Sequence, residues 1–349
     1  MSCWPRMVMC GVSRDVPAGS PPMPTIFEAL PGMDVPVGEI SKGLTQMWAD
    51  TAASGGPAPD ADDAKATQVN FVLHLGLNTT PADAAAQFQV VERFAQRYPS
   101  RVVVLCPQRE QNGATELGAK IHGECFLGKS KSDKRCIEFV ILSYSREARQ
   151  FLESQVSTCL STDLPLYYWA HRFSDSSKLA DYQYLLTRAR RVLIDSSIAP
   201  PDAMTFPWPK PEAVRDLVYA RLLPVRQTLG QFLSRYAMDS ICEKLGIVTV
   251  AHAEGLAAEG GVLLGWLRDR VGQCGQNRAT FSLDALPPGA NTSLEVGFKY
   301  SDQKFFAWTG NFTQRTALFE ADFGTGRTRL PASVSLLAPE AALSEAMFF

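Results

Sequence analysis

The segment GECFLGKS, residues 123–130, matches the phosphate-binding pattern G-x-x-x-x-G-K-[ST] at every required position. In such a loop the backbone N–H groups surround the phosphates, the lysine contacts them and the hydroxyl binds Mg²⁺. The segment VLID, residues 192–195, ends in an aspartate, as do the metal-binding strands of nucleotide hydrolases. One hypothesis is therefore a nucleotide- or sugar-phosphate-binding α/β enzyme that uses Lys129 and Asp195.

The residues around Lys129 favour a different structure. Residues 124–127 continue the alternating pattern of a strand, and no helix-forming run follows Ser130. A phosphate-binding loop needs a helix that begins directly after it, because the N-terminus of that helix faces the phosphates. We therefore predict a β-hairpin whose strands, 119–127 and 136–142, are joined by a polar turn that contains GKSKSDKR.

Two cysteines, Cys125 and Cys136, lie in this predicted hairpin. They face each other across the strands if the hairpin is symmetric about residues 130 and 131, and facing cysteines approach disulfide distance. They are then a candidate redox pair. The alternative is that both are small apolar side chains in a half-buried sheet, and the sequence does not fix the register that decides between these structures.

Other catalytic signals are absent from the sequence. It has no G-x-G-x-x-G, no G-x-S-x-G and no HExxH, and its cysteines form no CxxC and no zinc-ligand spacing. Each of its four histidines lies within or beside a strand-like apolar run, which favours a packed structural role; His171, after an aromatic run, deserves the closest inspection. From these motifs we expect no catalytic residues, no cofactor and no bound metal.

Composition sets further limits. The 349 residues are 46% hydrophobic and 20% charged, which suits a globular protein of two domains. A net charge of −2 without a basic stripe argues against nucleic acid as a partner. The apolar runs are far shorter than the roughly 20 residues that span a bilayer. The scattered cysteines indicate a reducing compartment, so we expect a cytoplasmic protein that does not contact membranes.

The first half of the chain alternates strand-like and helix-like segments. This pattern predicts an α/β layered domain with parallel and antiparallel strands. Expected strands cover 68–77, 101–107, 119–127, 136–142, the LPLYYWA run and 192–195, while expected helices begin at Pro81 and cover about 146–159 and 179–187. The segments 68–77 and 101–107, joined by a helix, should be parallel.

The second half has a different pattern. Five prolines within residues 199–211 indicate a domain boundary. A long helix is expected over about 212–236, kinked or broken at Pro224, and a second helix over 260–271, followed by turn-separated antiparallel strands. The predicted organisation is a disordered extension (1–22), an N-terminal helix and linker (23–66), an α/β domain (67–200) and a C-terminal α+β domain (211–349) with helices packed on a largely antiparallel sheet.

Four segments, taken in order, carry a family resemblance: DLPLYYWAH at 163–171, VLIDSS at 192–197, LVYARLLPVRQTLGQFL at 217–233 and VLLGWLRDRVG at 262–272. The sequence resembles the glucose-6-phosphate dehydrogenase assembly protein family, OpcA, over about residues 65–275. It differs from the family pattern at Ala170 and Val225, where the family usually has tryptophan. The residues that match the pattern, and that the resemblance makes candidates for family motifs or partner contacts, are Asp163, Pro165, Trp169, Asp195, Ser196, Arg221, Arg226, Gly265 and Trp266.

The resemblance implies a non-catalytic accessory protein. Members of the family bind glucose-6-phosphate dehydrogenase, promote its active oligomer and raise its activity, which supports the oxidative pentose phosphate pathway and NADPH supply. The expected partner is therefore the dehydrogenase, with this chain as its allosteric activator, and no cofactor is implied.

Overall fold

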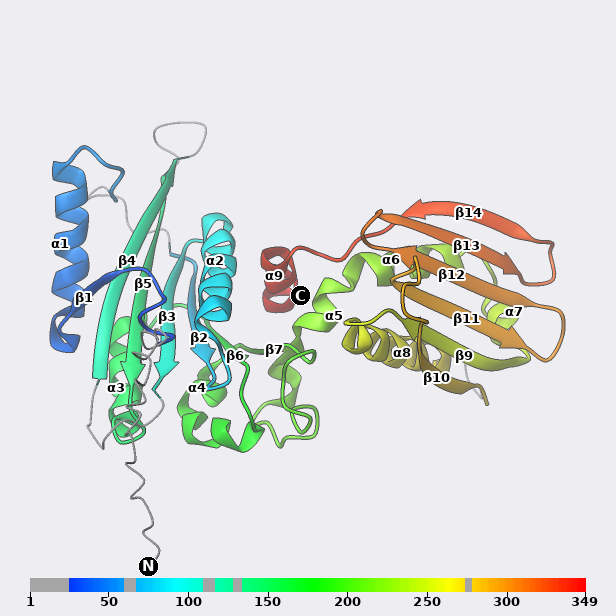
Figure 1. Ribbon diagram of the computed structural model, residues 1–349, viewed down its shortest axis with the longest axis horizontal. Helices are drawn as coiled ribbons and strands as arrows, with labels where there is room; N and C mark the ends of the chain where they lie inside the picture. The colour runs from blue at the N-terminus through cyan, green and yellow to red at the C-terminus, as the bar shows by residue number, and fades with distance from the viewer. Residues whose placement is uncertain (1–24, 60–66, 109–116, 128–133, 274–277) are drawn as a thin grey trace, which may run out of the picture.

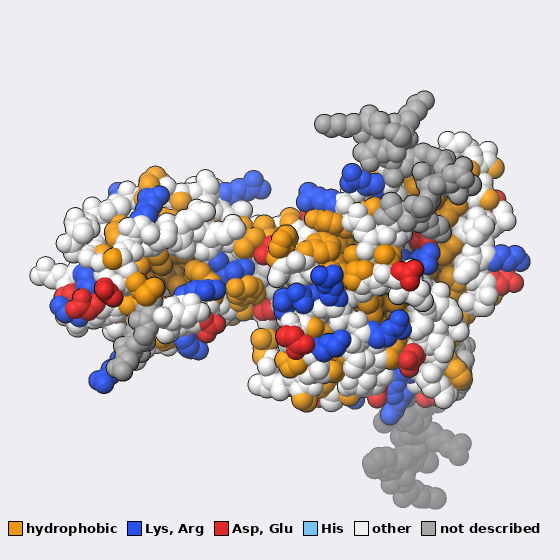
Figure 2. Space-filling view, turned by 180° about the vertical axis from the view of Figure 1, so that it is seen from behind, with side chains coloured by type: hydrophobic (Ala, Val, Ile, Leu, Met, Phe, Trp, Pro, Cys, Tyr) orange, Lys and Arg blue, Asp and Glu red, His pale blue; other side chains and the backbone are white. Residues whose placement is uncertain are grey.

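Two β-sheets and the helices around them make up the protein (Figure 1). The computed structural model describes residues 25–59, 67–108, 117–127, 134–273 and 278–349. Seen from behind, the two sheets belong to two lobes joined by a narrower waist (Figure 2). The mixed α/β architecture predicted from the sequence is confirmed. The predicted extension of residues 1–22 lies outside the described residues.

The first sheet has eight strands and is covered by helices on both faces. Its strands, in spatial order, are β1 (Met33–Val35), β4 (Leu117–Leu127), β5 (Lys134–Tyr144), β3 (Ser100–Pro107), β2 (Val69–Leu75), β6 (Leu166–His171), β7 (Arg191–Ile194) and β8 (Val214–Asp216). One face packs against α1 (Ile40–Ala53), α3 (Arg149–Cys159) and α4 (Gln183–Arg188), together with the short 3-10 segments η1 (Val37–Glu39) and η2 (Ser176–Tyr182). The other face packs against α2 (Pro81–Arg97), α5 (Leu217–Arg221) and α9 (Pro339–Phe348).

The predicted strand–helix–strand unit is confirmed. Strands β2 and β3 are parallel neighbours, and α2 crosses between them. Local sequence explains where α2 begins, because the Thr80 hydroxyl accepts a hydrogen bond from the Asp83 N–H and Pro81 occupies the first turn. The buried side chains of α2 include Phe88, Val91 and Phe94, the apolar positions expected at helical spacing.

The predicted hairpin is also confirmed. Strands β4 and β5 are antiparallel, and Cys125 lies directly opposite Cys136. The two cysteines form a disulfide on the face of the hairpin opposite to α2. On that face Gly123 leaves room for the side chains of Met47 and Trp48, and a Cβ atom at Gly123 would come within 2.4 Å of Met47 Cε.

The second sheet has six strands in the order β10 (Thr280–Ala285), β9 (Leu245–His252), β11 (Leu294–Tyr300), β12 (Phe305–Asn311), β13 (Thr316–Asp322) and β14 (Thr328–Ser333). All neighbouring pairs are antiparallel except β9 and β10, which are parallel because α8 (Ala257–Gly272) connects them. Helices α8 and α6 (Leu223–Leu233) supply the apolar side chains that complete its core, and α7 (Met238–Cys242) precedes β9.

A single continuous helix over residues 212–236 does not form, whereas the alternative of a break at Pro224 is confirmed. The chain forms η3 (Pro211–Ala213), then β8, which pairs with β7, and then two short helices, α5 and α6. The Asp216 carboxylate accepts a hydrogen bond from the Val218 N–H and so begins α5 only after β8 has ended. Pro224, which has no N–H to continue a helix, lies in the first turn of α6 and explains the break.

Helix α9 was not expected from the sequence. It leaves the second sheet and packs on the first, where Leu343 and Met347 join the core beside α2 (Figure 1). The first sheet therefore gains one strand, β8, and two helices, α5 and α9, from the segment assigned to the C-terminal domain. The division of the chain near residues 199–211 stays a prediction.

Candidate functional site at the junction of the two sheets

Three charged side chains meet where the chain passes from the first sheet to the second. Asp195 follows β7, Arg221 ends α5, and Glu259 lies in the first turn of α8. An Nη atom of Arg221 lies 2.8 Å from Asp195 Oδ2 and the other lies 2.7 Å from Glu259 Oε1. The Arg221 Nε atom also donates to Glu259 at 2.8 Å. The guanidinium thus joins an element of each sheet; we call these three residues the Arg221 cluster.

Burial and charge act in opposite directions on the cluster. Burial alone would lower the pKa of Arg221, but the hydrogen bonds and charges of Asp195 and Glu259 outweigh it and raise that pKa. The side chains of Arg221, Asp195 and Glu259 are only 19%, 15% and 5% exposed, respectively. A guanidinium with two carboxylates in such a site forms short, directional hydrogen bonds. The arrangement therefore fixes the geometry of the junction.

Ser196 and Asp216 form a second contact beside the Arg221 cluster. The backbone N–H and the hydroxyl of Ser196 both donate to the Asp216 carboxylate, at 3.0 and 2.7 Å. Burial is the main reason that the pKa of Asp216 is raised, and the nearby Asp195 charge adds to it. Since the same carboxylate begins α5, this contact ties the end of β7 to the helix that carries Arg221.

Arg226 lies one turn further along the chain and stacks on an aromatic ring. Its guanidinium is 3.6 Å from the centre of the Tyr219 ring and donates to the Tyr219 carbonyl at 3.1 Å. Burial lowers the pKa of Arg226, although the Glu345 carboxylate of α9 acts in the opposite direction. The stack places an arginine and a partly exposed tyrosine close to the helix that returns to the first sheet.

Gly265 and Trp266 lie on α8, the helix that supplies Glu259. Trp266 is half-buried and packs against the core of the second sheet. A Cβ atom at Gly265 would have no other atom within 4 Å, so this glycine is not required by close packing. The structure thus brings Asp195, Ser196 and Arg221 together, and it places the remaining pattern residues of the second half on the neighbouring helices.

Asp163, Pro165 and Trp169 lie elsewhere. Asp163 and Pro165 precede β6, whereas Asp195 follows the parallel strand β7, so they lie at opposite ends of the sheet. The Pro165 carbonyl accepts from the Asn70 N–H, and Trp169 is 3% exposed within the core on the α2 face. Pro165 and Trp169 thus support the first sheet, whereas Asp163 is exposed and accepts a hydrogen bond from the Thr162 hydroxyl.

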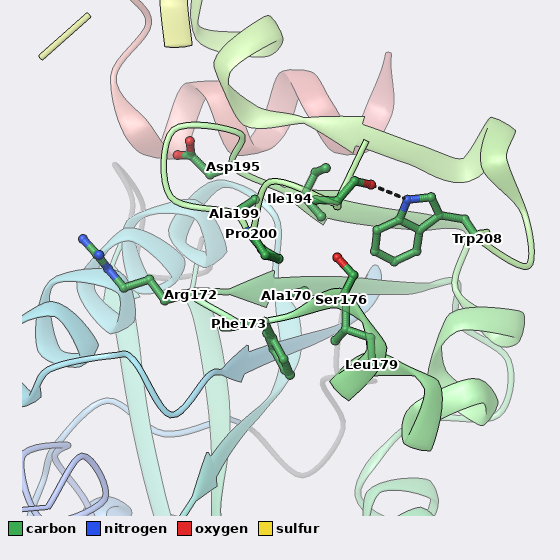
Figure 3. A pocket seen from close by; sticks show the side chains of 11 residues that line it. Ala170, Arg172, Phe173, Ser176, Leu179, Ile194, Asp195, Ala199, Pro200 and Trp208 are labelled. Carbon is green, nitrogen blue, oxygen red and sulfur yellow. Dashed lines mark hydrogen bonds between the residues drawn. The ribbon is translucent and has the colours of Figure 1, made fainter. Parts of the chain in front are cut away.

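A small hollow lies outside the carboxyl ends of β6 and β7 (Figure 3). Arg172, Phe173, Asp195 and Trp208 are among the residues that line it. Its polar side chains already hold the surrounding loops, since the Trp208 indole donates to the Ala203 carbonyl at 2.9 Å. The space of about 280 Å³ includes open solvent at its mouth, so the enclosed part is smaller than this.

Next to this hollow, His171 and Arg172 share one carboxylate. Asp83 Oδ2 lies 2.8 Å from His171 Nε2 and 2.6 Å from Arg172 Nε. Burial would raise the pKa of Asp83, but the His171 hydrogen bond and the nearby charges lower it to about 2. Arg172 adopts a left-handed backbone, with a φ of 52°, and a Cβ atom at Gly76 would lie 2.3 Å from the Arg172 carbonyl oxygen. The contacts join β6 to α2, which supports a structural role for His171.

Sequence reasoning did not identify Glu259 or Asp83 as partners of the predicted residues. The only available signal was position, because each is an acidic residue in the first turn of a helix. Which basic residue each carboxylate contacts depends on how the strands and helices pack. Local sequence spacing does not determine that packing.

The sheet topology places residues 123–127 far from residues 192–195, the two segments on which the nucleotide-hydrolase hypothesis depends. Residues 123–127 are part of β4, and the chain is again a strand, β5, from Lys134 onward; Lys129 and Ser130 lie outside the described residues. Strand β4 ends at the sheet edge from which β7 starts, because β5, β3, β2, β6 and β7 are mutually parallel and β4 is antiparallel to them. Five strand spacings, roughly 24 Å, also separate β4 from β7.

Comparison with known protein families gives a match over part of the chain. Residues 91–206 match the family described as the glucose-6-phosphate dehydrogenase subunit N-terminal domain. This match confirms the resemblance to the glucose-6-phosphate dehydrogenase assembly protein family. It includes the disulfide, β6, β7 and the lining of the hollow, while Arg221, Arg226, Gly265 and Trp266 lie beyond it.

Two other comparisons complete the findings. A search of curated proteins gives no match to the sequence. Among solved structures, the chain is similar to the crystal structure of aldose-aldose oxidoreductase from Caulobacter crescentus complexed with glycerol, with 12% identity and a TM-score of 0.38, covering 80% of this chain and 87% of the other. A likeness this weak transfers no property to this protein.

Proposed function

We propose that this protein is a non-catalytic accessory protein that binds glucose-6-phosphate dehydrogenase and promotes assembly of its active oligomer. The family match over residues 91–206 supports an assembly-related role. The observation that carries the proposal further is the Arg221 cluster, in which side chains matched by the family pattern are used to hold two sheets together. Side chains that hold two sheets together are expected in a protein that acts by presenting a fixed surface to a partner.

Activation by such a protein requires differential affinity. An accessory protein shifts an assembly equilibrium only if it binds the assembled or substrate-competent enzyme more tightly than the inactive form. A fixed relation between the two lobes helps, because a contact that spans both lobes then loses less conformational freedom on binding. In this proposal the dehydrogenase, and through it the supply of NADPH in the cytoplasm, is the object of regulation.

The proposal is tested by titrating glucose-6-phosphate dehydrogenase from the same organism with the purified full-length protein. Activity is measured at low substrate, and the mass of the enzyme is followed in parallel by analytical ultracentrifugation. We expect saturable activation together with a shift to a larger complex. Absence of both binding and activation would reject the assembly role.

Two variants make this titration more specific. Arg221→Ala removes the guanidinium that joins the sheets, so we expect weaker activation at a given concentration of the accessory protein. Arg268→Ala is the matched control, because Arg268 is an exposed arginine on α8 whose recorded contact is with the Phe281 ring, 5.2 Å away. Equal activation by both variants would show that the junction does not matter for the interaction.

Redox control of the same activity is a further part of the proposal. The disulfide between Cys125 and Cys136 lies within the family-matched segment. The titration is therefore repeated with oxidised protein, with reduced protein and with Cys136→Ser, and intact mass is used to count free thiols. Activation that is the same in all three samples would leave the disulfide a purely structural bond.

A further inference from the structure

Three potential metal ligands converge between α2 and the hairpin, away from the Arg221 cluster. Glu92 lies on α2, and His122 and Glu124 lie two residues apart on β4, so that their side chains point to the same face. One ligand atom from each residue lies within 4.8 Å of the other two, and His122 Nε2 is 3.7 Å from Glu92 Oε1. Each side chain is partly buried, which leaves access for water.

The charges of this group call for a cation. The carboxyl groups of Glu92 and Glu124 lie close together between α2 and β4. Arg93, the next residue on α2, pairs with Glu340 instead, at 3.4 Å. Among the described side chains no lysine or arginine forms an ion pair with Glu92 or Glu124. Two adjacent carboxylates without a cation repel each other, and a bound metal ion removes that repulsion.

His122 is suited to be the third ligand. Its ring packs against Phe88 and Phe139, with ring centres 5.7 and 5.8 Å away. An imidazole nitrogen is a common ligand of divalent transition-metal ions. The two aromatic rings restrict the orientation of the imidazole and so hold its lone pair near the carboxylates.

We propose that Glu92, His122 and Glu124 form a binding site for a divalent transition-metal ion, with Zn²⁺ as the best-matched ion. One nitrogen and two carboxylate ligands, with space for water, form a common zinc donor set, whereas Mg²⁺ and Ca²⁺ prefer oxygen ligands alone. Two ligand atoms on one zinc ion lie about 3.4 Å apart, because the bonds are about 2.1 Å long and the geometry is tetrahedral. The 3.7 Å separation of His122 and Glu92 is close to this value.

The consequence of binding is mechanical. The ion ties the middle of α2 to β4 at the residue next to Cys125, on the opposite face of the hairpin from the disulfide. The register of the hairpin at Glu124 is therefore fixed from one face by the disulfide and from the other by the metal ion. This site is independent of the proposed dehydrogenase partner.

The test uses full-length protein stripped of metal with a chelator and titrated with Zn²⁺ by calorimetry. Glu92→Gln and His122→Gln each remove one ligand and keep a similar shape, so we expect zinc affinity to fall roughly 100-fold or more in each. The matched control is Glu254→Gln, an exposed glutamate outside this group, which should bind zinc as the wild type does. Zinc should raise the Tm of the wild type and of the control only.

Two further measurements separate ligand loss from unfolding and from binding at cysteines. Glu92→Gln relieves the repulsion between carboxylates, so its metal-free Tm should equal or exceed that of the wild type. With Co²⁺ as the probe, the visible spectrum should show nitrogen and oxygen ligands without thiolate charge transfer. Zinc affinity that is unchanged in both ligand variants, or a cobalt spectrum dominated by thiolate, would overturn the proposal.

Discussion

The two sheets differ in how many of their faces are covered. All seven residues of β2 and all six of β6 are buried, because helices lie on both faces of the first sheet (Figure 1). In the second sheet, β12 and β13 alternate buried with partly exposed residues, and α6 and α8 cover one face. Parallel connections carry helices across a sheet, whereas hairpins do not, so the connections decide whether a face is covered.

The largest effects should come from neighbouring residues that test this difference. Val72 and Leu73 are both fully buried but belong to cores on opposite faces of the first sheet. Each substitution to alanine should cost roughly 2 kcal/mol or more in the free energy of unfolding, since each leaves a cavity. On β12, Trp308→Ala should cost roughly 3–5 kcal/mol, and Thr309→Ala less than about 1 kcal/mol.

Urea-induced unfolding followed by circular dichroism provides the measurement. The first sheet should show two large losses for its two adjacent residues, and the second should show one large and one small loss. A large loss for Thr309→Ala would mean that the second face of that sheet is also covered, and the comparison between the sheets would then fail.

Because the two sheets differ in how many faces are covered, their strands differ in hydrophobic pattern, and the sequence therefore predicted most of these strands. Continuous apolar runs such as VVVL, residues 102–105, indicate burial on both faces, and alternation indicates burial on one. The hairpin that carries Cys125 and Cys136 was predicted from the same alternation, but its register was not, since a turn of unknown conformation allows several. The pattern of apolar residues therefore predicts where a strand lies. The register in which two strands pair depends on contacts outside those strands.

Contacts between distant segments could not be predicted. Helix α9 uses small side chains, with Ala342 and Ala346 beside Leu343 and Met347, and its sequence gives no sign that it returns to the first sheet. The partner of Arg221 was equally hidden, since Glu259 is 38 residues away and on another sheet's helix. Part of the candidate site was thus predicted. The family pattern identified Arg221 and Asp195 as candidates, and the fold shows that they contact each other.

The Arg221 cluster joins the two differently covered sheets, and its loss should have the next largest effect. Arg221→Ala leaves Asp195 and Glu259 close together without their shared cation, and should cost about 3 kcal/mol in the free energy of unfolding. Arg221→Lys keeps the charge but cannot donate to both carboxylates in the same fork, so we expect an intermediate loss. The measurement is again the urea midpoint, and Arg268→Ala, the exposed control on α8, should change it by less than about 0.5 kcal/mol.

If Arg221→Ala altered hydrogen exchange in only one sheet, the proposed coupling of the two sheets by the Arg221 cluster would be contradicted. Hydrogen exchange resolves the two sheets in the same sample. If Arg221 couples them, Arg221→Ala should speed exchange both in β7 and β8 and in the first turns of α8. Faster exchange in only one of these regions would show that the ion pairs stabilise a local loop and not the junction.

The smallest predicted effect concerns His74, a polar side chain in the core of the first sheet, which is covered on both faces. His74 is fully buried, and its two ring nitrogens lie 2.7 Å from the hydroxyls of Tyr168 and Tyr144, the latter 2.8 Å from Tyr182 Oη. Burial lowers the pKa of His74 to about 3. Burial also raises the pKa of Tyr144 and Tyr168, so these hydroxyls stay neutral and offer no anion to a charged imidazole.

The sign of the pH dependence follows from this depressed pKa. Below the unfolded value of 6.5 the unfolded chain binds a proton that folded His74 does not bind, so stability falls as the pH decreases toward 3. Between pH 7 and pH 5 this residue should remove about 2 kcal/mol. His74→Gln retains an amide donor and acceptor but has no proton to gain, so comparing urea midpoints of the two proteins at both pH values isolates the effect. Equal losses in wild type and variant would mean that His74 is protonated in the folded protein, and the first sheet would then admit a charge that its covered faces are expected to exclude.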